Sequence, residues 1–135
     1  MDGYLPYPGR IRILHVDDEP VDLEITRKFL KGEGNGVFEI SSVLSAEKAL
    51  AKLERGRFEV IISDYKMPEM DGIKLFEEVR RMGCGIPFIF FSGTTEPEII
   101  EGALNKGADR YILKTLNLRD QYKELAHAIR DLVAK

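Results

Sequence analysis

Acidic side chains follow two apolar runs of the sequence, at the point where each run ends. Asp17 and Asp18 come directly after "IRILHV", and Asp64 comes directly after "EVIIS". Carboxylates that are gathered in one place repel one another, which should raise the pKa of at least one of them, and burying them is costly unless their charge is paired. We therefore expect a cation among the three side chains. Oxygen ligands in this number favour Mg²⁺, which also keeps waters and an oxygen of a phosphorylated substrate in its coordination shell.

Two more reactive side chains stand at the ends of later apolar runs. Ser92 ends "IPFIFFS" and Lys114 ends "YILK". Phosphoryl transfer needs a nucleophile, a divalent cation, a hydroxyl and an ammonium around one point, because the reaction depends on positioning and on neutralising charge that spreads over the phosphoryl oxygens. Aspartate can itself accept phosphate as a covalent aspartyl phosphate. The pattern therefore predicts phosphoryl transfer onto an aspartate.

Alternating apolar and amphipathic segments must position these side chains. The predicted strands are 11–16, 37–43, 58–63, 86–91 and 108–113, and the predicted helices are 21–32, 45–56, 71–83, 96–107 and 119–134, the first four each closed by a glycine. The strands are nearly continuous in hydrophobicity, which is typical of strands buried on both faces. This order predicts an α/β fold with a parallel sheet and helices on both faces. Its active site should lie beyond the carboxyl ends of the strands.

Composition narrows the class of protein. The chain has 135 residues with 44% hydrophobic and 32% charged side chains. Its net charge of −3 lacks the positive excess that is typical of nucleic-acid-binding domains. No apolar stretch approaches the roughly 18 to 20 residues that span a bilayer, and we expect neither a membrane span nor a secretion leader. The one cysteine, Cys84, cannot form an internal disulfide. We expect a single cytoplasmic domain at residues 11–135 after an irregular leader at residues 1–10.

The motifs "VDDE", "SDYKMPEMDG", "FSG" and "YILK", in this order and spacing, resemble the receiver domain of two-component response regulators from about Arg12 to the end. The resemblance implies a flavodoxin-like, doubly wound (βα)5 sandwich with strand order 2-1-3-4-5. It implies a stand-alone phosphorelay module rather than an enzyme, one that only assists its own phosphorylation and dephosphorylation. Its expected partners are a sensor histidine kinase or a phosphotransfer protein, which phosphorylates Asp64, and a downstream effector protein, with no nucleic acid or membrane.

The same resemblance implies a set of metal ligands. Asp18 would bind Mg²⁺ directly, and Asp17 would hold it directly or through water. Asp64 and the main-chain carbonyl of Lys66 would complete the protein ligands. Met67, Pro68 and Gly72 match the family's turn from the acceptor strand into the next helix.

It also implies a conformational switch. Ser92 would bond the phosphoryl group and Lys114 would pair with it. Tyr111 matches the aromatic side chain whose rotamer reports the state of the Ser92 hydroxyl. The signal would then appear on the face made by helix 96–107, strand 108–113 and helix 119–134.

One position departs from the family's pattern. The family usually has a cis proline after the lysine, whereas this chain has Thr115. A cis bond costs about 2.5 to 4 kcal/mol before other residues, against about 0.5 to 1 kcal/mol before proline. We therefore predict a trans Lys114–Thr115 bond, with the Lys114 ammonium still directed at Asp64. Thr94 and Lys66 occupy the family's positions that affect phosphoryl lifetime.

Several assignments have simpler alternatives. Asp17 and Asp18 can cap the helix near Pro20 as well as bind metal. Asp64 and Ser92 are also ordinary turn residues, and Tyr111 also fits a plain core or surface aromatic. His15 and His127 lack any partner pattern, and we interpret both as structural rather than as phosphorelay histidines.

Two other functions share part of the pattern. A Mg²⁺-dependent phosphohydrolase also uses a nucleophilic aspartate, but such enzymes commonly carry Asp-x-Asp, and "SDYKMP" lacks the second acid. A flavodoxin-like flavin binder would need a phosphate loop after the first strand, where this chain has an acidic one.

Overall fold

Residues 10–134 are described by the computed structural model, so the predicted leader lies outside the described residues except for Arg10. The strands are β1 (Ile11–Val16), β2 (Phe38–Val43), β3 (Val60–Ser63), β4 (Phe88–Ser92) and β5 (Arg110–Leu113). The helices are α1 (Pro20–Gly34), α2 (Ala46–Arg55), α3 (Gly72–Arg81), α4 (Pro97–Asn105) and α5 (Leu118–Ala134). Each predicted strand and helix is therefore present, in the predicted order.

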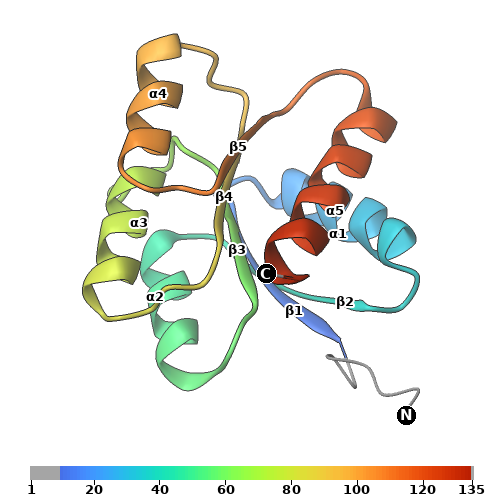
Figure 1. Ribbon diagram of the computed structural model, residues 1–135, viewed down its shortest axis with the longest axis horizontal. Coiled ribbons are helices and arrows are strands. Elements are labelled where there is room, and N and C mark those ends of the chain that lie inside the picture. The colour runs from blue at the N-terminus through green and yellow to red at the C-terminus, as the bar shows by residue number, and fades with distance from the viewer. Residues whose placement is uncertain (1–9, 135) are drawn as a thin grey trace.

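The strands form one parallel sheet in the order β2-β1-β3-β4-β5. Helices α1 and α5 cover one face of the sheet, and α2, α3 and α4 cover the other (Figure 1). This is the predicted doubly wound sandwich. The order of the strands along the sheet reverses between β1 and β3, and a ligand site is expected at such a topological switch point, beyond the carboxyl ends of the strands.

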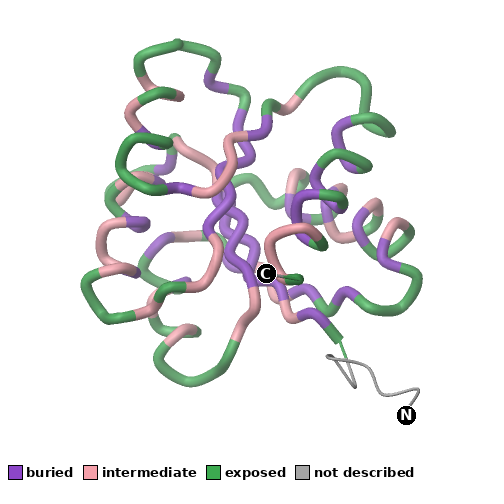
Figure 2. Tube along the Cα trace, in the orientation of Figure 1, coloured by how far each residue is buried: buried purple, intermediate pink, exposed green. Residues whose placement is uncertain are grey.

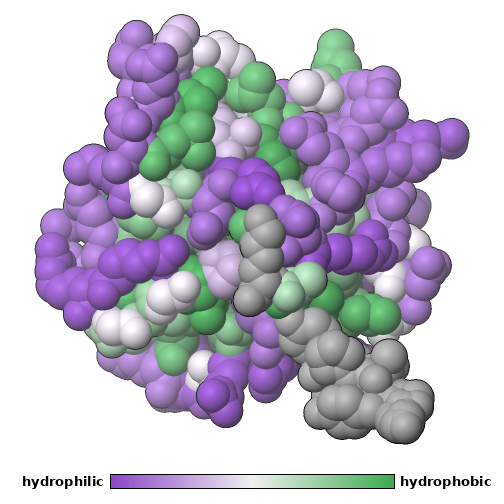
Figure 3. All heavy atoms as spheres, in the orientation of Figure 1, coloured by the Kyte–Doolittle hydropathy of each residue, from purple (hydrophilic) through white to green (hydrophobic). Residues whose placement is uncertain are grey.

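Two hydrophobic cores fill the space between the sheet and its helices. Alternate residues of β1 separate them: Ile11 and Ile13 pack with α1 and α5, whereas Leu14 and Val16 pack with α2, α3 and α4. Figure 2 shows the sheet as the most continuously buried part of the chain. Hydrophilic side chains cover most of the face in Figure 3, and hydrophobic ones gather in smaller patches between them. In the described part of the chain, no helix has the length and apolarity to cross a bilayer.

The ends of some elements differ from the prediction. Helix α1 does not end at Gly32 but continues to Gly34, and Asn35 closes it in the left-handed region at φ 50°. Asparagine tolerates that conformation because its short polar side chain bonds locally, so it can replace the glycine that usually ends a helix. Strand β4 begins at Phe88 rather than Ile86. Pro87, which lacks an N–H, still accepts the Ile61 amide at 3.0 Å.

Candidate functional site

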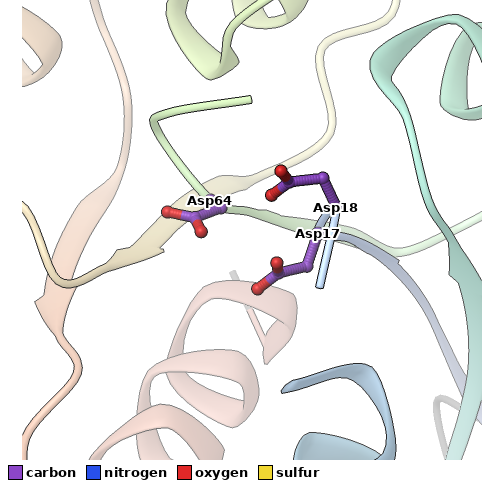
Figure 4. Close-up of side chains that lie close together, drawn as sticks. All are labelled: Asp17, Asp18 and Asp64. Carbon is purple, nitrogen blue, oxygen red and sulfur yellow. The ribbon is translucent and has the colours of Figure 1, made fainter. Parts of the chain in front are cut away.

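Three aspartates meet where β1 and β3 end. The two strands are neighbours, and Val16 of β1 is in register with Ser63 of β3, so the residues that follow them lie side by side. One oxygen from each of Asp17, Asp18 and Asp64 lies within 4.8 Å of the others. Figure 4 shows all three side chains at the same end of the two strands. The strand-end prediction for the carboxylates is therefore confirmed.

Asp17 is the most deeply buried of the three, with a side chain that has no solvent exposure. One of its oxygens accepts the Glu19 amide at 3.0 Å, and the other accepts the Lys114 ammonium at 2.7 Å. Burial raises the pKa of Asp17, its bonds to Lys114 and Glu19 oppose that rise, and repulsion from Asp64 adds a smaller increase. The expected rise is present, but burial rather than mutual repulsion is its main cause.

The ammonium of Lys114 reaches the acids from the end of β5. Its Nζ lies 2.7 Å from Asp17, 3.1 Å from Asp22 and 3.4 Å from Asp64. Burial alone would lower the pKa of Lys114, but its hydrogen bond and attraction to Asp17, together with Asp64 and Asp22, raise it above the ordinary lysine value. Lys114 is therefore directed at Asp64 as predicted. Its contact with Asp22 is a feature that the sequence analysis missed.

The bond between Lys114 and Thr115 is trans, as predicted, and the described residues contain no cis peptide bond. Gln121 of α5 holds the loop at this point. Its side chain accepts the Thr115 amide at 3.2 Å and donates to the Thr115 carbonyl at 2.9 Å. The Lys114 amide donates to the Ser92 carbonyl at 2.9 Å, which extends the β4–β5 pairing. A buried glutamine therefore holds the backbone beside the lysine.

Ser92 is buried at the end of β4, and its hydroxyl accepts the Thr94 amide at 3.2 Å. Tyr111 donates its hydroxyl to the Thr94 carbonyl at 2.9 Å and stacks on Phe90. Burial raises the pKa of Tyr111, and the nearby Ser92 and Thr94 oxygens oppose that rise. Among the hydrogen bonds of the described residues, none joins Ser92 to Asp64. Ser92 and Tyr111 are instead joined to each other through Thr94, which the sequence marked only as a position that affects phosphoryl lifetime.

The loop after Asp64 is packed tightly against the site. The Tyr65 amide donates to one Asp64 oxygen at 2.7 Å, and the Gly72 amide donates to the Tyr65 carbonyl at 2.7 Å. A Cβ on Gly72 would lie 2.3 Å from the Asp64 carbonyl, so only glycine lets α3 approach the acceptor this closely. Lys66 lies in this loop with an exposed side chain. The loop thus fixes the orientation of Asp64.

Neither histidine is a member of this cluster. His15 is 1% exposed, and neither ring nitrogen has a hydrogen-bond partner in the described residues. Burial, with Lys114 and Arg27 nearby, lowers the pKa of His15 to about 3, so its ring is neutral. A phosphoryl donor cannot reach so buried a ring. His127 is exposed on α5.

The chain is similar to known signalling proteins over most of its length. The family model described as the response regulator receiver domain matches residues 13–126. The "Two-component response regulator ORR1" of Oryza sativa subsp. japonica is 35% identical over 121 residues, which are 83% of this chain and 52% of that protein. The chain therefore spans about half of that relative's length. These matches give no support to a phosphohydrolase.

Solved structures agree in fold. A CheY-like response regulator receiver domain protein from Methanospirillum hungatei JF-1 is 32% identical, with a TM-score of 0.78 over 92% of this chain and 97% of that one. The chemotaxis protein CheY4 of Vibrio cholerae is 28% identical, with a TM-score of 0.78 over 89% of this chain and 99% of that one.

Proposed function

This chain belongs to the response regulator receiver domain family, which consists of phosphoacceptor signalling modules, and we propose that Asp64 is its phosphoacceptor. The observation that carries the proposal is the convergence of the Asp17, Asp18 and Asp64 oxygens within 4.8 Å, with the Lys114 ammonium 3.4 Å from Asp64. Asp64 is the one of the three that lies beside both the ammonium and the tightly packed loop before α3. We infer that Asp17 and Asp18 bind the cation and do not accept the phosphoryl group.

The chemistry of the transfer follows from these positions. We propose that a carboxylate oxygen of Asp64 attacks the phosphorus of a phosphohistidine on a sensor histidine kinase or a phosphotransfer protein. A P–O bond forms to Asp64, the P–N bond breaks, and its electron pair returns to the imidazole nitrogen. The Tyr65 amide and the Lys114 ammonium orient the carboxylate, and the ammonium balances charge on the phosphoryl oxygens.

The acidic cluster fits a hard divalent cation. The donors are carboxylate oxygens, which Mg²⁺ prefers, and the single ammonium of Lys114 leaves the four nearby acids with excess negative charge. We propose that Asp17, Asp18, Asp64 and the Lys66 carbonyl hold Mg²⁺. Bound there, the ion would neutralise negative charge on the incoming phosphoryl group.

The signal would leave through Ser92 and Tyr111. The Ser92 hydroxyl accepts the Thr94 amide, and the Tyr111 hydroxyl donates to the Thr94 carbonyl. We propose that Ser92 bonds the phosphoryl group, that this moves Thr94, and that Tyr111 then changes its position. The equilibrium between conformations of the domain would then shift toward one whose α4, β5 and α5 surface binds an effector protein. We propose the cytoplasm as the compartment where the kinase and the effector meet this domain.

The acceptor is tested by incubation with acetyl phosphate and Mg²⁺, followed by intact mass spectrometry. Wild type should gain one phosphoryl group, and Asp64→Asn should gain none. Asp120→Asn, an exposed aspartate on α5, is the matched control and should be labelled like wild type. Unchanged labelling of Asp64→Asn would refute the assignment. Sustained turnover of a phosphate ester by wild type would point to a phosphohydrolase instead.

A further inference from the structure

The Lys114 ammonium is shared with an acid that belongs to neither the acceptor nor the proposed metal ligands. Asp22 lies 3.1 Å from Nζ, between the 2.7 Å distance to Asp17 and the 3.4 Å distance to Asp64. The acceptor is thus the farthest of the three carboxylates from the ammonium. Asp22 is also the most exposed of them, at 40%, so it stands at the solvent side of the site.

The fold holds Asp22 at this place. It lies in the first turn of α1, which begins at Pro20, whose fixed φ suits a helix start. Thr26, one turn further along, shares a buried 2.7 Å hydrogen bond with Tyr122 of α5. This bond fastens α1 against the helix that follows β5. Asp22 is therefore carried by a well-packed helix, and its distance from Lys114 is set by the tertiary structure.

A simpler role for Asp22 is to stabilise α1. An acid in the first turn of a helix interacts favourably with the positive end of the helix dipole. That role explains the residue type, but it gives no reason for the side chain to bond the ammonium of Lys114, which follows β5. The two roles also differ in outcome, since a dipole effect changes folding stability and does not depend on Lys114.

We propose that Asp22 is a positioning residue that restrains the Lys114 ammonium in the unphosphorylated domain and competes with the phosphoryl group for it. A phosphoryl group on Asp64 draws the ammonium toward itself, so the contact with Asp22 must weaken as the switch turns on. Because Asp22 is partly exposed and hydrated, it can release the ammonium at little cost. Asp22 thus biases this domain toward its unphosphorylated form. The proposal rests on the function proposed above, because it assumes that Asp64 is the acceptor.

The test measures the affinity for beryllofluoride, a non-covalent mimic of a phosphoryl group, by ¹⁹F NMR titration at saturating Mg²⁺. Asp22→Asn should bind the mimic about two- to fivefold more tightly, the range that corresponds to an exposed ion pair. Asp22→Glu, which restores the charge, should return the affinity toward wild type. Equal or weaker binding by Asp22→Asn would overturn the proposal.

A double-mutant cycle separates competition for the ammonium from plain charge repulsion. In a Lys114→Ala background, Asp22→Asn should no longer tighten binding of the mimic. The same gain in that background would mean that Asp22 only repels the anion, and would overturn the proposal. Should Lys114→Ala fail to fold, the ¹⁵N resonance of the Lys114 ammonium gives the separation. A resonance that differs between wild type and Asp22→Asn before the mimic is added supports restraint, and an identical resonance in the two proteins would overturn the proposal.

A failure of the underlying function gives a different result. If wild type bound no mimic and Asp64→Asn were labelled by acetyl phosphate as well as wild type, the acceptor assignment would be wrong, and the proposal on Asp22 would fall with it. If wild type bound the mimic normally and Asp22→Asn matched it, only the proposal on Asp22 would fail.

Discussion

Replacing Lys114 with methionine should destabilise the fold strongly, because the buried carboxylate of Asp17 would lose its cation. Asp17 has no solvent exposure and lies 2.7 Å from Nζ. Removing one partner of a buried ion pair typically costs about 3 to 5 kcal/mol. Lys114 itself keeps 21% of its side chain exposed, so we expect a value near the lower end, about 3 kcal/mol, at neutral pH without Mg²⁺.

Urea denaturation in EDTA measures this loss, and two further conditions identify its cause. Burial raises the pKa of Asp17 above its ordinary 3.8, so its contribution to stability is present below that pH and is lost as the pH rises through the raised pKa. Without Lys114 that pKa should rise further, and lowering the pH from 7 to 5 should recover part of the loss. Mg²⁺ should also recover part of it, because the ion replaces the missing positive charge.

Lys106→Met is the matched control. Lys106 also forms an ion pair, at 3.2 Å to Glu77, but the pair is on the surface. Such pairs contribute about 0 to 1 kcal/mol. A loss for Lys114→Met no larger than for this control, or a loss that grows as the pH falls to 5, would refute the reasoning.

Three further predictions concern the metal, the switch and the loop. Millimolar Mg²⁺ should raise the melting temperature of wild type, and Asp18→Ala should remove most of that rise; an unmoved melting temperature in wild type would mean that the metal site is misread. Ser92→Ala should still be labelled by acetyl phosphate, while amide chemical shifts on α4, β5 and α5 respond less to beryllofluoride; a full-size response would count against the switch. Gly72→Ala should cost about 1 to 3 kcal/mol in urea denaturation and slow labelling of Asp64, because its Cβ would lie 2.3 Å from the Asp64 carbonyl; wild-type behaviour in both assays would contradict that account of the loop.

The sequence was sufficient for the sheet and for the acids at its edge. Continuous apolar runs separated by amphipathic ones leave few arrangements other than a parallel sheet, and the strand-end rule then brings Asp17, Asp18 and Asp64 together. Lys114 was found for the same reason, because it too ends a strand. The end of α1 was predicted wrongly, since Gly32 was the expected stop and Asn35 serves instead.

The contacts that were missed depend on how helices pack on the sheet. Asp22 resembles any acid in a first helical turn, and only the packing of α1 against α5 brings it to Lys114, which follows β5. Gln121 stands next to the apolar stripe of α5, and nothing local shows that it bonds both backbone groups of Thr115. The cause of the raised pKa of Asp17 was also hidden, because the sequence shows neighbouring charges but not depth of burial.

The central claim is that Asp64 receives the phosphoryl group, and mapping the modified residue tests it most directly. The protein is labelled with acetyl phosphate and Mg²⁺, the acyl phosphate is trapped with borohydride, which reduces the modified aspartate to homoserine, and the peptides are sequenced by mass spectrometry. We predict homoserine at Asp64 and at no other position. Homoserine at Asp17 or Asp18, or no trapped residue in a protein that has gained phosphoryl mass, would contradict the account.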